Sequence, residues 1–531
     1  MSFGNGWSRK TLWTIALGTM LAGGALAADL GQVRTNIGTV EGTTSTDGKV
    51  HIFKGIPYAA PPVGDLRWKA PQPAAPWANV RKATEFGARC MQTNVFGDMN
   101  FRDNGPSEDC LYLNVWTPAS SASAHLPVMV WIYGGGFVAG ASSEPRQDGE
   151  VLAKKGVIVV SFNYRLGIFG FFAHSDLAKE SEHHSSGNYG LLDQVAALQW
   201  VQKNIAAFGG DPKNVTIFGE SAGSFAVSAL MGSPLAKDLF HRAIGESGAF
   251  FGTSLGLKTL AEAEETGAKF GQAVGAADVA ALRAIPADKL LQEATKENPF
   301  RFPQDIDGYF FPEDVRETYA NGKQAHVALL AGWNHDEGNY RAIFGKDDPT
   351  AKGFATHAEQ MFGDKSAEFL KLYPASSDEE AKSSANDLGG DLFIAYSTWK
   401  WLEMQLKTGE SPIYRYEFDD AMPVPADAGP NAPHGAYHSS EIEFVFEALP
   451  SKHYDWRPGD EKLSDLMSSY WTNFAKKGDP NGPSLPHWPE YNSKDSYQVM
   501  HLTFDSKAEP DAHRGRYLFL DANHPRPPQR P

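Results

Sequence analysis

Short, mostly apolar runs recur along the chain and predict buried β-strands. The clearest runs are residues 128–133, 157–162 and 215–218. Because their apolar residues occupy both faces of the strand, they are typical of parallel strands that helices cover on each side. Similar runs at 327–331 and 413–418 predict two further strands.

Helical spacing of apolar residues separates several of these strands. Residues 191–208 repeat apolar side chains every three or four positions, which predicts an amphipathic helix. A similar face at 463–474 predicts a second helix, which ends near Gly478 because two lysines and a glycine are stop signals. The alternation predicts an α/β fold with a doubly wound sheet, and the more polar, helical stretch at 257–390 is expected to cap or flank it.

The composition narrows the class of protein. The chain has 531 residues, of which 42 % are hydrophobic and 12 % aromatic, and it contains 2 cysteines. These values exclude a disordered chain and a small disulfide-stapled scaffold. The net charge of −16, with no cluster of basic residues, argues against a nucleic-acid partner. There is no internal repeat or linker, so we expect one domain over residues 28–523 and a disordered tail at 524–531.

The N-terminus predicts export. Arg9 and Lys10 precede an uncharged stretch that ends in the small-residue site Ala25-Leu26-Ala27. This is the layout of a secretory signal, here residues 1–27, with cleavage after Ala27. An uncleaved membrane anchor is the alternative, but the stretch is short and contains glycines. No later segment is apolar enough to span a bilayer, so the mature protein is expected in the periplasm or the medium.

Export makes a disulfide between the two cysteines plausible. An exported protein meets an oxidising compartment, where Cys90 and Cys110 can form a disulfide. Such a bond closes a loop of about twenty residues, worth roughly 3 kcal/mol in the chain-entropy model. Two buried free thiols are the alternative. No Cys-x-x-Cys or His-x-x-x-His pattern accompanies them, so a metal site is not expected.

A possible nucleophile follows one predicted strand. Gly219-Glu220-Ser221-Ala222-Gly223 comes directly after residues 215–218 and precedes a helix-like stretch at 224–231. This is the Gly-x-Ser-x-Gly pattern of a nucleophile elbow, in which a strained turn lifts the serine oxygen clear of the sheet. Glycines two residues before and after relieve the crowding of that turn. The alternative is a structural Gly-Ser turn.

A serine nucleophile needs a base and an acid that orients the base. In elbows of this kind the chain order is serine, then acid, then histidine. One candidate loop follows the strand at 327–331 and holds Asp336 and Glu337, and another follows the strand at 413–418 and holds His434 and His438. Spacing alone leaves both choices open.

At this point the chain resembles the type-B carboxylesterases, a family that includes the cholinesterases and the bacterial para-nitrobenzyl esterases. The resemblance is carried by these segments, in order: 53–59, 61–64, 66–68, 107–115, the glycine run 134–136 with Phe137, 163–167, and 204–223. It implies an α/β-hydrolase fold, with a central, mostly parallel sheet flanked by helices and helical cap-like insertions.

The resemblance also assigns the acid and the base. The family acid is the Glu of an Asp-Glu-Gly sequence, which is Glu337 here. The family histidine lies three residues before the Glu-Ile-x-Phe-Val-Phe segment that starts at Glu441, so it is His438. His335, Asp336 and His434 then become neighbours with structural or pocket roles.

Further site features follow from the same resemblance. It implies an oxyanion hole made by the backbone N–H groups of Gly135, Gly136 and Ala222. Fixed donors of this kind need no reorganisation during the reaction. It also implies a disulfide that joins the two cysteines. A buried ion pair is implied between Arg67 and Glu108.

The sequence therefore predicts a secreted serine hydrolase that acts on small-molecule carboxylic esters without a metal or organic cofactor. Choline esters are disfavoured, because the loop 91–109 contains Phe96 and Phe101 but no tryptophan to hold a quaternary ammonium. Trp333 either lines the pocket or packs in the core. Activity is expected to fall as His438 protonates, at about pH 6 to 7 for an ordinary histidine.

Two other functions remain as alternatives. The same triad could cleave amides or carbamates more slowly, because their leaving groups are poorer. A non-catalytic adhesion or binding protein of this fold is disfavoured, because the binding relatives have lost the serine that is Ser221 here. The acyl preference and the oligomeric state are not indicated by the sequence.

Overall fold

The computed structural model describes residues 1–4, 6, 30–252, 254–296, 299–425, 427–429 and 432–525. The predicted export signal lies outside these ranges apart from its first residues, and so does the predicted tail after residue 525. Within the described ranges, none of the helices has the length and hydropathy needed to cross a membrane.

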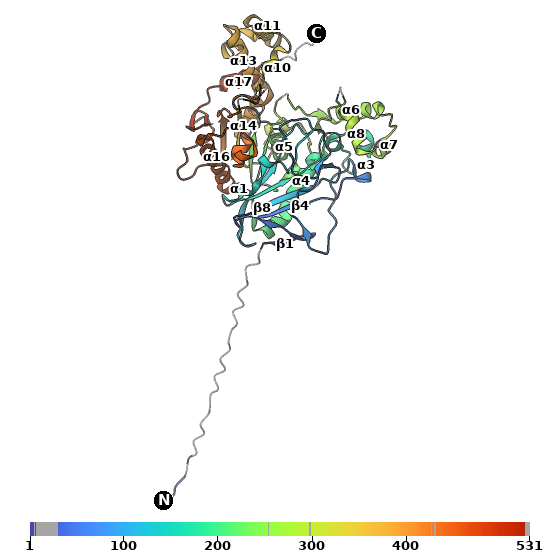
Figure 1. The fold of residues 1–531 in the computed structure, drawn as a ribbon, viewed down its shortest axis with the longest axis vertical. Helices are drawn as coiled ribbons and strands as arrows, with labels where there is room; N and C mark the ends of the chain where they lie inside the picture. The colour runs from blue at the N-terminus through green and yellow to red at the C-terminus, as the bar shows by residue number, and fades with distance from the viewer. Residues whose placement is uncertain are drawn as a thin grey trace.

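The centre of the molecule is an 11-stranded sheet with the order β18-β17-β16-β15-β12-β11-β9-β10-β8-β4-β3. From β10 to β17 every neighbouring pair is parallel, and the strands at both edges pair antiparallel. The strands are β3 Thr43–Thr44, β4 His51–Pro57, β8 Tyr112–Thr117, β9 Leu126–Ile132, β10 Ile158–Phe162, β11 Gly210–Glu220, β12 Arg242–Glu246, β15 Ala328–Asn334, β16 Ile413–Phe418, β17 Gln498–Leu502 and β18 Lys507–Pro510. This mostly parallel sheet confirms the expected fold class (Figure 1).

The predicted strands all lie in this sheet, with small shifts at their ends. The run at 413–418 coincides with β16, whereas the run at 215–218 is part of the longer β11. β4, β17 and β18 have no continuous apolar run, because each lies at or next to an edge of the sheet and is partly exposed. Sequence patterning therefore found five strands of the sheet and missed others, which include the buried central strand β12.

The two predicted helices are also present. α4 spans Tyr189–Asn204 and continues as a 3-10 turn to Phe208. α16 spans Pro458–Lys477 and ends at Gly478, whose φ of 77° is left-handed as a glycine stop requires. α16 packs against β9 and β11, while α5 (Ala222–Gly232) packs against β11 and β12. The nucleophile elbow thus enters a helix that is itself buried on the sheet.

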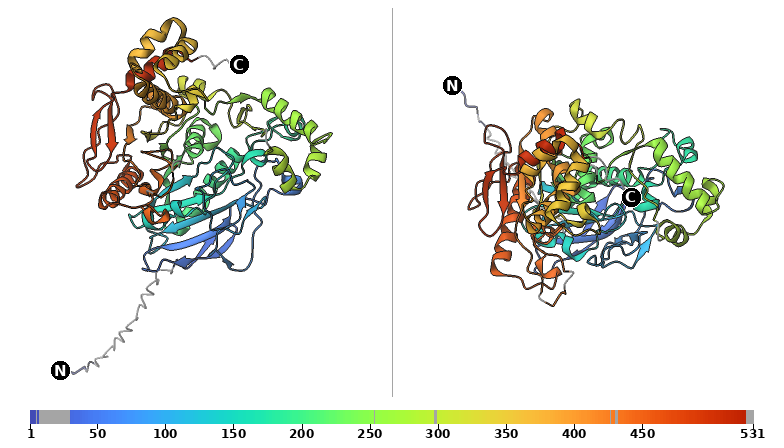
Figure 2. Two further views of the ribbon diagram at one scale, coloured as in Figure 1. Left: turned by 45° about the horizontal axis from the view of Figure 1, so that its top comes forward. Right: turned by 90° about the horizontal axis from the view of Figure 1, so that it is seen from above.

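The polar stretch at 257–390 is largely helical, as expected, and it forms two separate groups. α6 (Leu260–Ala273), α7 (Val279–Ala284) and α8 (Ala287–Ala294) lie at one side of the sheet, around a small apolar core that they share with Trp68 and residues 168–189. α10, α11, α12 and α13 lie away from them, beside the C-terminal helix α17 (Figures 1 and 2). Their bounds are Arg341–Phe344, Ala351–Phe362, Ser366–Leu372, Asp378–Gly390 and, for α17, Arg514–Ala522.

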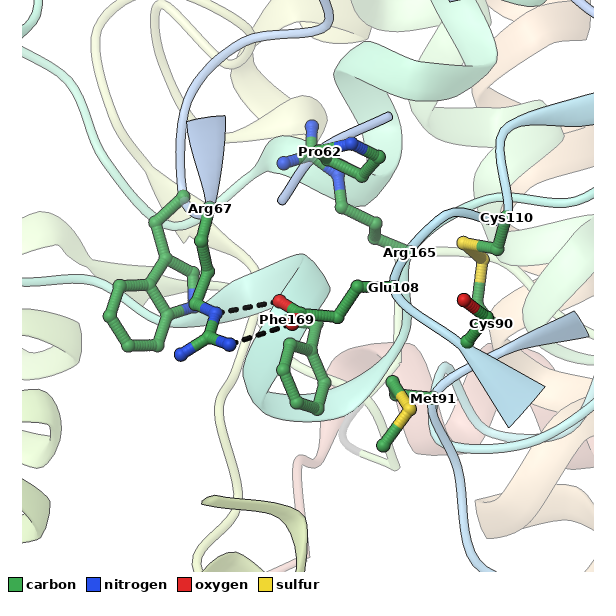
Figure 3. A pocket seen from close by; sticks show the side chains of 10 residues that line it. Pro62, Arg67, Cys90, Met91, Glu108, Cys110, Arg165 and Phe169 are labelled. Carbon is green, nitrogen blue, oxygen red and sulfur yellow. Dashed lines mark hydrogen bonds and ion pairs between the residues drawn. A yellow bond between two sulfur atoms is a disulfide. The ribbon is translucent and has the colours of Figure 1, made fainter. Parts of the chain in front are cut away.

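A buried ion pair and a disulfide lie close together near the N-terminal part of the chain (Figure 3). The Arg67 guanidinium donates to both carboxylate oxygens of Glu108, each at 2.6 Å, and its remaining amino group donates to the carbonyl of Ile285 at 2.7 Å. Cys90 and Cys110 form a disulfide with their Cα atoms 4.9 Å apart. The pair fixes the segment that carries Glu108 against the end of α7.

Candidate active site

Ser221 occupies the sharp turn between β11 and α5. Its φ of 53° and ψ of −123° are strained for a residue with a side chain. The two elbow glycines are required by β9, which runs alongside: a Cβ at Gly223 would lie 1.9 Å from the carbonyl oxygen of Ile132, and one at Gly219 would lie 2.6 Å from it. Only glycine permits so close an approach. The pattern therefore forms the strained turn that the sequence predicted.

Glu337, His438 and Ser221 form one hydrogen-bonded chain. His438 Nε2 lies 2.9 Å from Ser221 Oγ, and His438 Nδ1 lies 2.7 Å from Glu337 Oε1. Glu337 is in the loop after β15, and His438 is in the loop that precedes the short helix α15 (Ile442–Val445). Because the carboxyl ends of parallel strands share one edge of a sheet, loops distant in sequence meet here.

The neighbouring candidates have other contacts. The Asp336 carboxylate accepts the backbone N–H of Ala436 at 2.8 Å, which joins the acid loop to the histidine loop. His335 Nδ1 lies 3.0 Å from Glu417 Oε1, and His434 is exposed. Asp336 and His335 thus have partners other than Ser221, whereas His434 faces solvent.

The glycine run lies directly against the serine. Gly135 and Gly136 have φ angles of 103° and 61°, which favour glycine. A Cβ at Gly135 would lie 2.3 Å from the carbonyl oxygen of Ala139, and one at Gly134 would lie 3.0 Å from the Ser221 Cβ. The backbone can therefore turn tightly beside the serine, opposite the start of α5 at Ala222.

Three buried carboxyl groups surround the triad, and the sequence analysis missed their role. Glu220 and Glu246 are paired neighbours on β11 and β12, and Glu441 follows the histidine loop. Burial raises the pKa of Glu220 to about 7 and that of Glu246 to about 8, and it also raises the pKa of Glu441. The Trp471 indole donates to Glu246 at 2.7 Å. The sequence signal that could have indicated a role for Glu220 is its place as the second residue of the elbow, directly before Ser221.

The carboxylates of Glu220 and Glu337 change the titration of His438. Burial lowers the pKa of His438, but the negative charges of Glu220 and Glu337 outweigh it and raise that pKa to about 9. Glu220 Oε1 lies 3.3 Å from His438 Nε2, so it faces the same nitrogen as the serine. His438 therefore titrates above the range of about pH 6 to 7 that was expected for an ordinary histidine.

Partly exposed apolar side chains lie near His438 and the glycine run. Phe393 is 41 % exposed, and its ring packs on the His438 ring with centroids 5.1 Å apart. Val138 follows the glycine run and is 43 % exposed. Trp333, in contrast, is 3 % exposed and packs on the Arg415 guanidinium at 4.1 Å, so it is a core aromatic.

One group of possible metal ligands occurs among the described residues. Donor atoms of His335, Glu417 and Asp419 lie within 4.8 Å of one another. His335 already pairs with Glu417, and Asp419 lies 2.7 Å from His501 Nδ1. These contacts account for the group as histidine–carboxylate pairs.

A comparison with known families decides the class of protein. The sequence model of the carboxylesterase family matches residues 29–519. The chain belongs to the carboxylesterase family. This carboxylesterase is accordingly a hydrolase of carboxylic esters, and its substrates are small-molecule esters.

Individual relatives agree with this assignment. The carboxylesterase is 38 % identical over 510 residues to the fumonisin B1 esterase of Sphingopyxis macrogoltabida, covering 91 % of this chain and 89 % of that protein. It is 37 % identical over 508 residues to the para-nitrobenzyl esterase of Bacillus subtilis (strain 168), covering 92 % and 98 %. A solved PNB esterase superposes with a TM-score of 0.77 at 36 % identity, covering 92 % of this chain and 99 % of the other.

Proposed function

We propose that this carboxylesterase cleaves esters through an acyl-enzyme on Ser221, with His438 as the general base and Glu337 as the acid that orients it. The observation that carries the proposal is the unbroken chain Glu337–His438–Ser221, with contacts of 2.7 Å and 2.9 Å. The 2.9 Å contact is within the range in which a base can take the proton of a nucleophile, and the 2.7 Å contact is a hydrogen bond that can orient the imidazole.

The reaction would proceed in two acyl transfers. His438 Nε2 takes the proton of Ser221 Oγ as that oxygen attacks the ester carbonyl carbon, and the carbonyl oxygen becomes negative. The C–O bond to the alcohol then breaks, and His438 returns the proton to the departing alcohol oxygen. Water repeats the sequence on the acyl-enzyme and releases the carboxylic acid and free Ser221.

The negative oxygen would be held by the backbone N–H groups of Gly135, Gly136 and Ala222. The glycine run is suited to this because its tight turn lies against Ser221. Ala222 is the first residue of α5, so its N–H is among those a helix leaves without an internal partner. Fixed donors at such a position stabilise the oxyanion without reorganisation.

The protein would act outside the cytoplasm. Residues 1–27 have the layout of a cleaved export signal, and the disulfide between Cys90 and Cys110 suits an oxidising compartment. Choline esters are not expected as substrates. The loop 91–109 has no tryptophan, and the ring of Phe101 is occupied by the Arg89 guanidinium at 4.7 Å.

The test is hydrolysis of para-nitrophenyl acetate, butyrate, octanoate and palmitate by the purified protein and by Ser221→Ala. We expect the variant to lose at least about 10⁴-fold in rate, because loss of a serine nucleophile disables the triad. Ser123→Ala, at an exposed serine away from the site, is the matched control and should keep full activity. Equal rates from wild type and Ser221→Ala, with both folded, would contradict the proposal.

A further inference from the structure

A π-helical turn lies next to the triad. The residues Asp391–Ala395 form this turn, and it joins α13 to α14 (Tyr396–Thr408). Turns of this kind are rare and occur frequently at functional sites. The turn begins at a buried group, because the Tyr373 hydroxyl donates to the Asp391 carboxylate at 2.6 Å. One end of the turn is therefore fixed in the core.

The turn is also fixed against the loop that carries Glu337. A Cβ at Gly338 would lie 1.8 Å from the carbonyl oxygen of Asn386 and 2.7 Å from the backbone nitrogen of Gly390. A Cβ at Gly390 would lie 3.1 Å from the backbone nitrogen of Gly338. The two backbones are thus in direct contact, and glycine at both positions permits it. The position of the turn is set relative to Glu337.

From this fixed turn Phe393 reaches the histidine. Its ring meets the His438 ring at 65°, an edge-type contact, and yet 41 % of the residue is exposed. Most phenylalanine side chains of the described part of the chain are buried. An exposed ring that touches the proposed general base is therefore placed to contact a substrate bound there.

The proposed reaction indicates which part of the substrate Phe393 would contact. His438 must return a proton to the alcohol oxygen, so that oxygen lies within about 3 Å of His438 Nε2 when the ester bond breaks. The first carbon atoms of the alcohol then lie beside the His438 ring, where Phe393 packs. The acyl chain leaves the carbonyl carbon in a different direction from the alcohol oxygen.

We propose that Phe393 determines specificity for the alcohol part of the ester and favours aryl and longer alkyl alcohols over small ones. The inference rests on the proposed function, since it uses the proton return by His438. An aromatic ring gains contact with an apolar alcohol group and gains nothing from a methyl or ethyl group too short to reach it.

The test compares acetate esters, which share one acyl-enzyme and differ only in the alcohol. For Phe393→Ala, kcat/KM with phenyl and hexyl acetate is expected to fall about five- to tenfold, the scale of one lost aromatic contact. With methyl and ethyl acetate it should change less than about twofold. Deacylation should be unchanged, because the alcohol has left by then. Phe393→Leu should recover hexyl acetate better than phenyl acetate.

Phe504→Ala is the matched control, because Phe504 is 52 % exposed and packs on Arg457 instead of on the triad. It should leave all four acetates unchanged. An equal loss on all four acetates with Phe393→Ala would overturn the inference and make the ring a positioning group for His438. A loss that follows acyl length in the para-nitrophenyl series would overturn it as well. Absence of hydrolysis by the wild type would instead reject the proposed function.

Discussion

Glu220 Oε1 lies 3.3 Å from Nε2 of His438. The same nitrogen lies 2.9 Å from Ser221 Oγ. The neutral histidine can accept the serine proton, whereas the protonated histidine can donate to Glu220. In the proposed reaction, the carboxylate would therefore stabilise the imidazolium that forms when Ser221 Oγ attacks the ester. It also stabilises the protonated resting form, which cannot act as a base.

The first prediction concerns the pH dependence of the esterase. Only neutral His438 accepts a proton, so activity falls as pH decreases through its pKa, which the carboxylates raise to about 9. Glu220→Gln removes one of the two negative charges that raise this pKa. The acid limb of kcat/KM against pH should then move toward the ordinary histidine value of 6.5. The measurement is the pH–rate profile of both proteins with one acetate ester.

Glu265→Gln serves as its control, because Glu265 is an exposed helix residue paired with Lys269. An acid limb that does not move in Glu220→Gln would show that Glu220 does not set the titration of His438. The kcat of the variant at high pH is expected to fall, because the imidazolium loses its partner.

The second prediction concerns stability and pH. Burial, with the charge of Glu220 adding to it, raises the pKa of Glu246 from 4.5 to about 8. Between these values the folded protein holds a proton that the unfolded chain has lost. This contribution to stability is complete below about pH 4.5 and is lost as pH rises through 8.

Glu246→Gln keeps the acceptor for the Trp471 indole and removes the titration. The wild type should lose stability between pH 5 and 8 by up to a few kcal/mol more than the variant. Urea unfolding at several pH values measures the difference. Parallel curves for the two proteins would exclude the raised pKa.

The third prediction concerns the ion pair of Arg67 and Glu108. Glu108→Gln leaves the Arg67 guanidinium buried without a counter-charge, which should cost about 3 kcal/mol in the free energy of unfolding. The kcat/KM of the folded fraction should stay within about twofold, since the pair lies away from the triad. Glu313→Gln, which breaks a pair with exposed Lys323, should cost less than about 1 kcal/mol. Equal costs for the two variants would contradict a structural role for the buried pair.

The fourth prediction concerns the disulfide. The chain has only two cysteines, so a thiol reductant acts on the bond between Cys90 and Cys110 alone. Reduction should lower the free energy of unfolding by roughly 3 kcal/mol, the closure entropy of a loop of about twenty residues. The Cys90→Ser, Cys110→Ser double variant should match the reduced protein and no longer respond to reductant. If reductant also destabilised the double variant, the loss of stability would not come from the disulfide.

Much of the site could be predicted because its signals are local. The Ser221 elbow has a glycine on either side and a buried strand before it, and each of these is read from adjacent residues. The acid and the histidine lie in loops after predicted strands, but spacing could not choose Glu337 over Asp336 or His438 over His434. Their hydrogen bonds depend on how two loops meet, so that choice needed the family pattern.

The rest depends on contacts between distant segments. The raised pKa of Glu246 arises because β12 lies beside β11, which places two carboxyl groups together under the elbow. Phe393, which meets His438, lies in a π-helical turn, and no periodic pattern marks that turn. β17 lies next to the edge strand β18 and is partly exposed, and its apolar pattern is too weak to predict.

The strained backbone at Ser221 lowers the free energy of unfolding of the whole protein. A residue held at φ 53° and ψ −123° loses of order 1–3 kcal/mol relative to relaxed geometry, which is a sizeable part of a domain's total stability. Glycine at this position would relieve most of that cost while abolishing the nucleophile. The Ser221→Gly variant should therefore be inactive but more stable than the wild type. Packing elsewhere in the sheet compensates for the strain that the nucleophile requires.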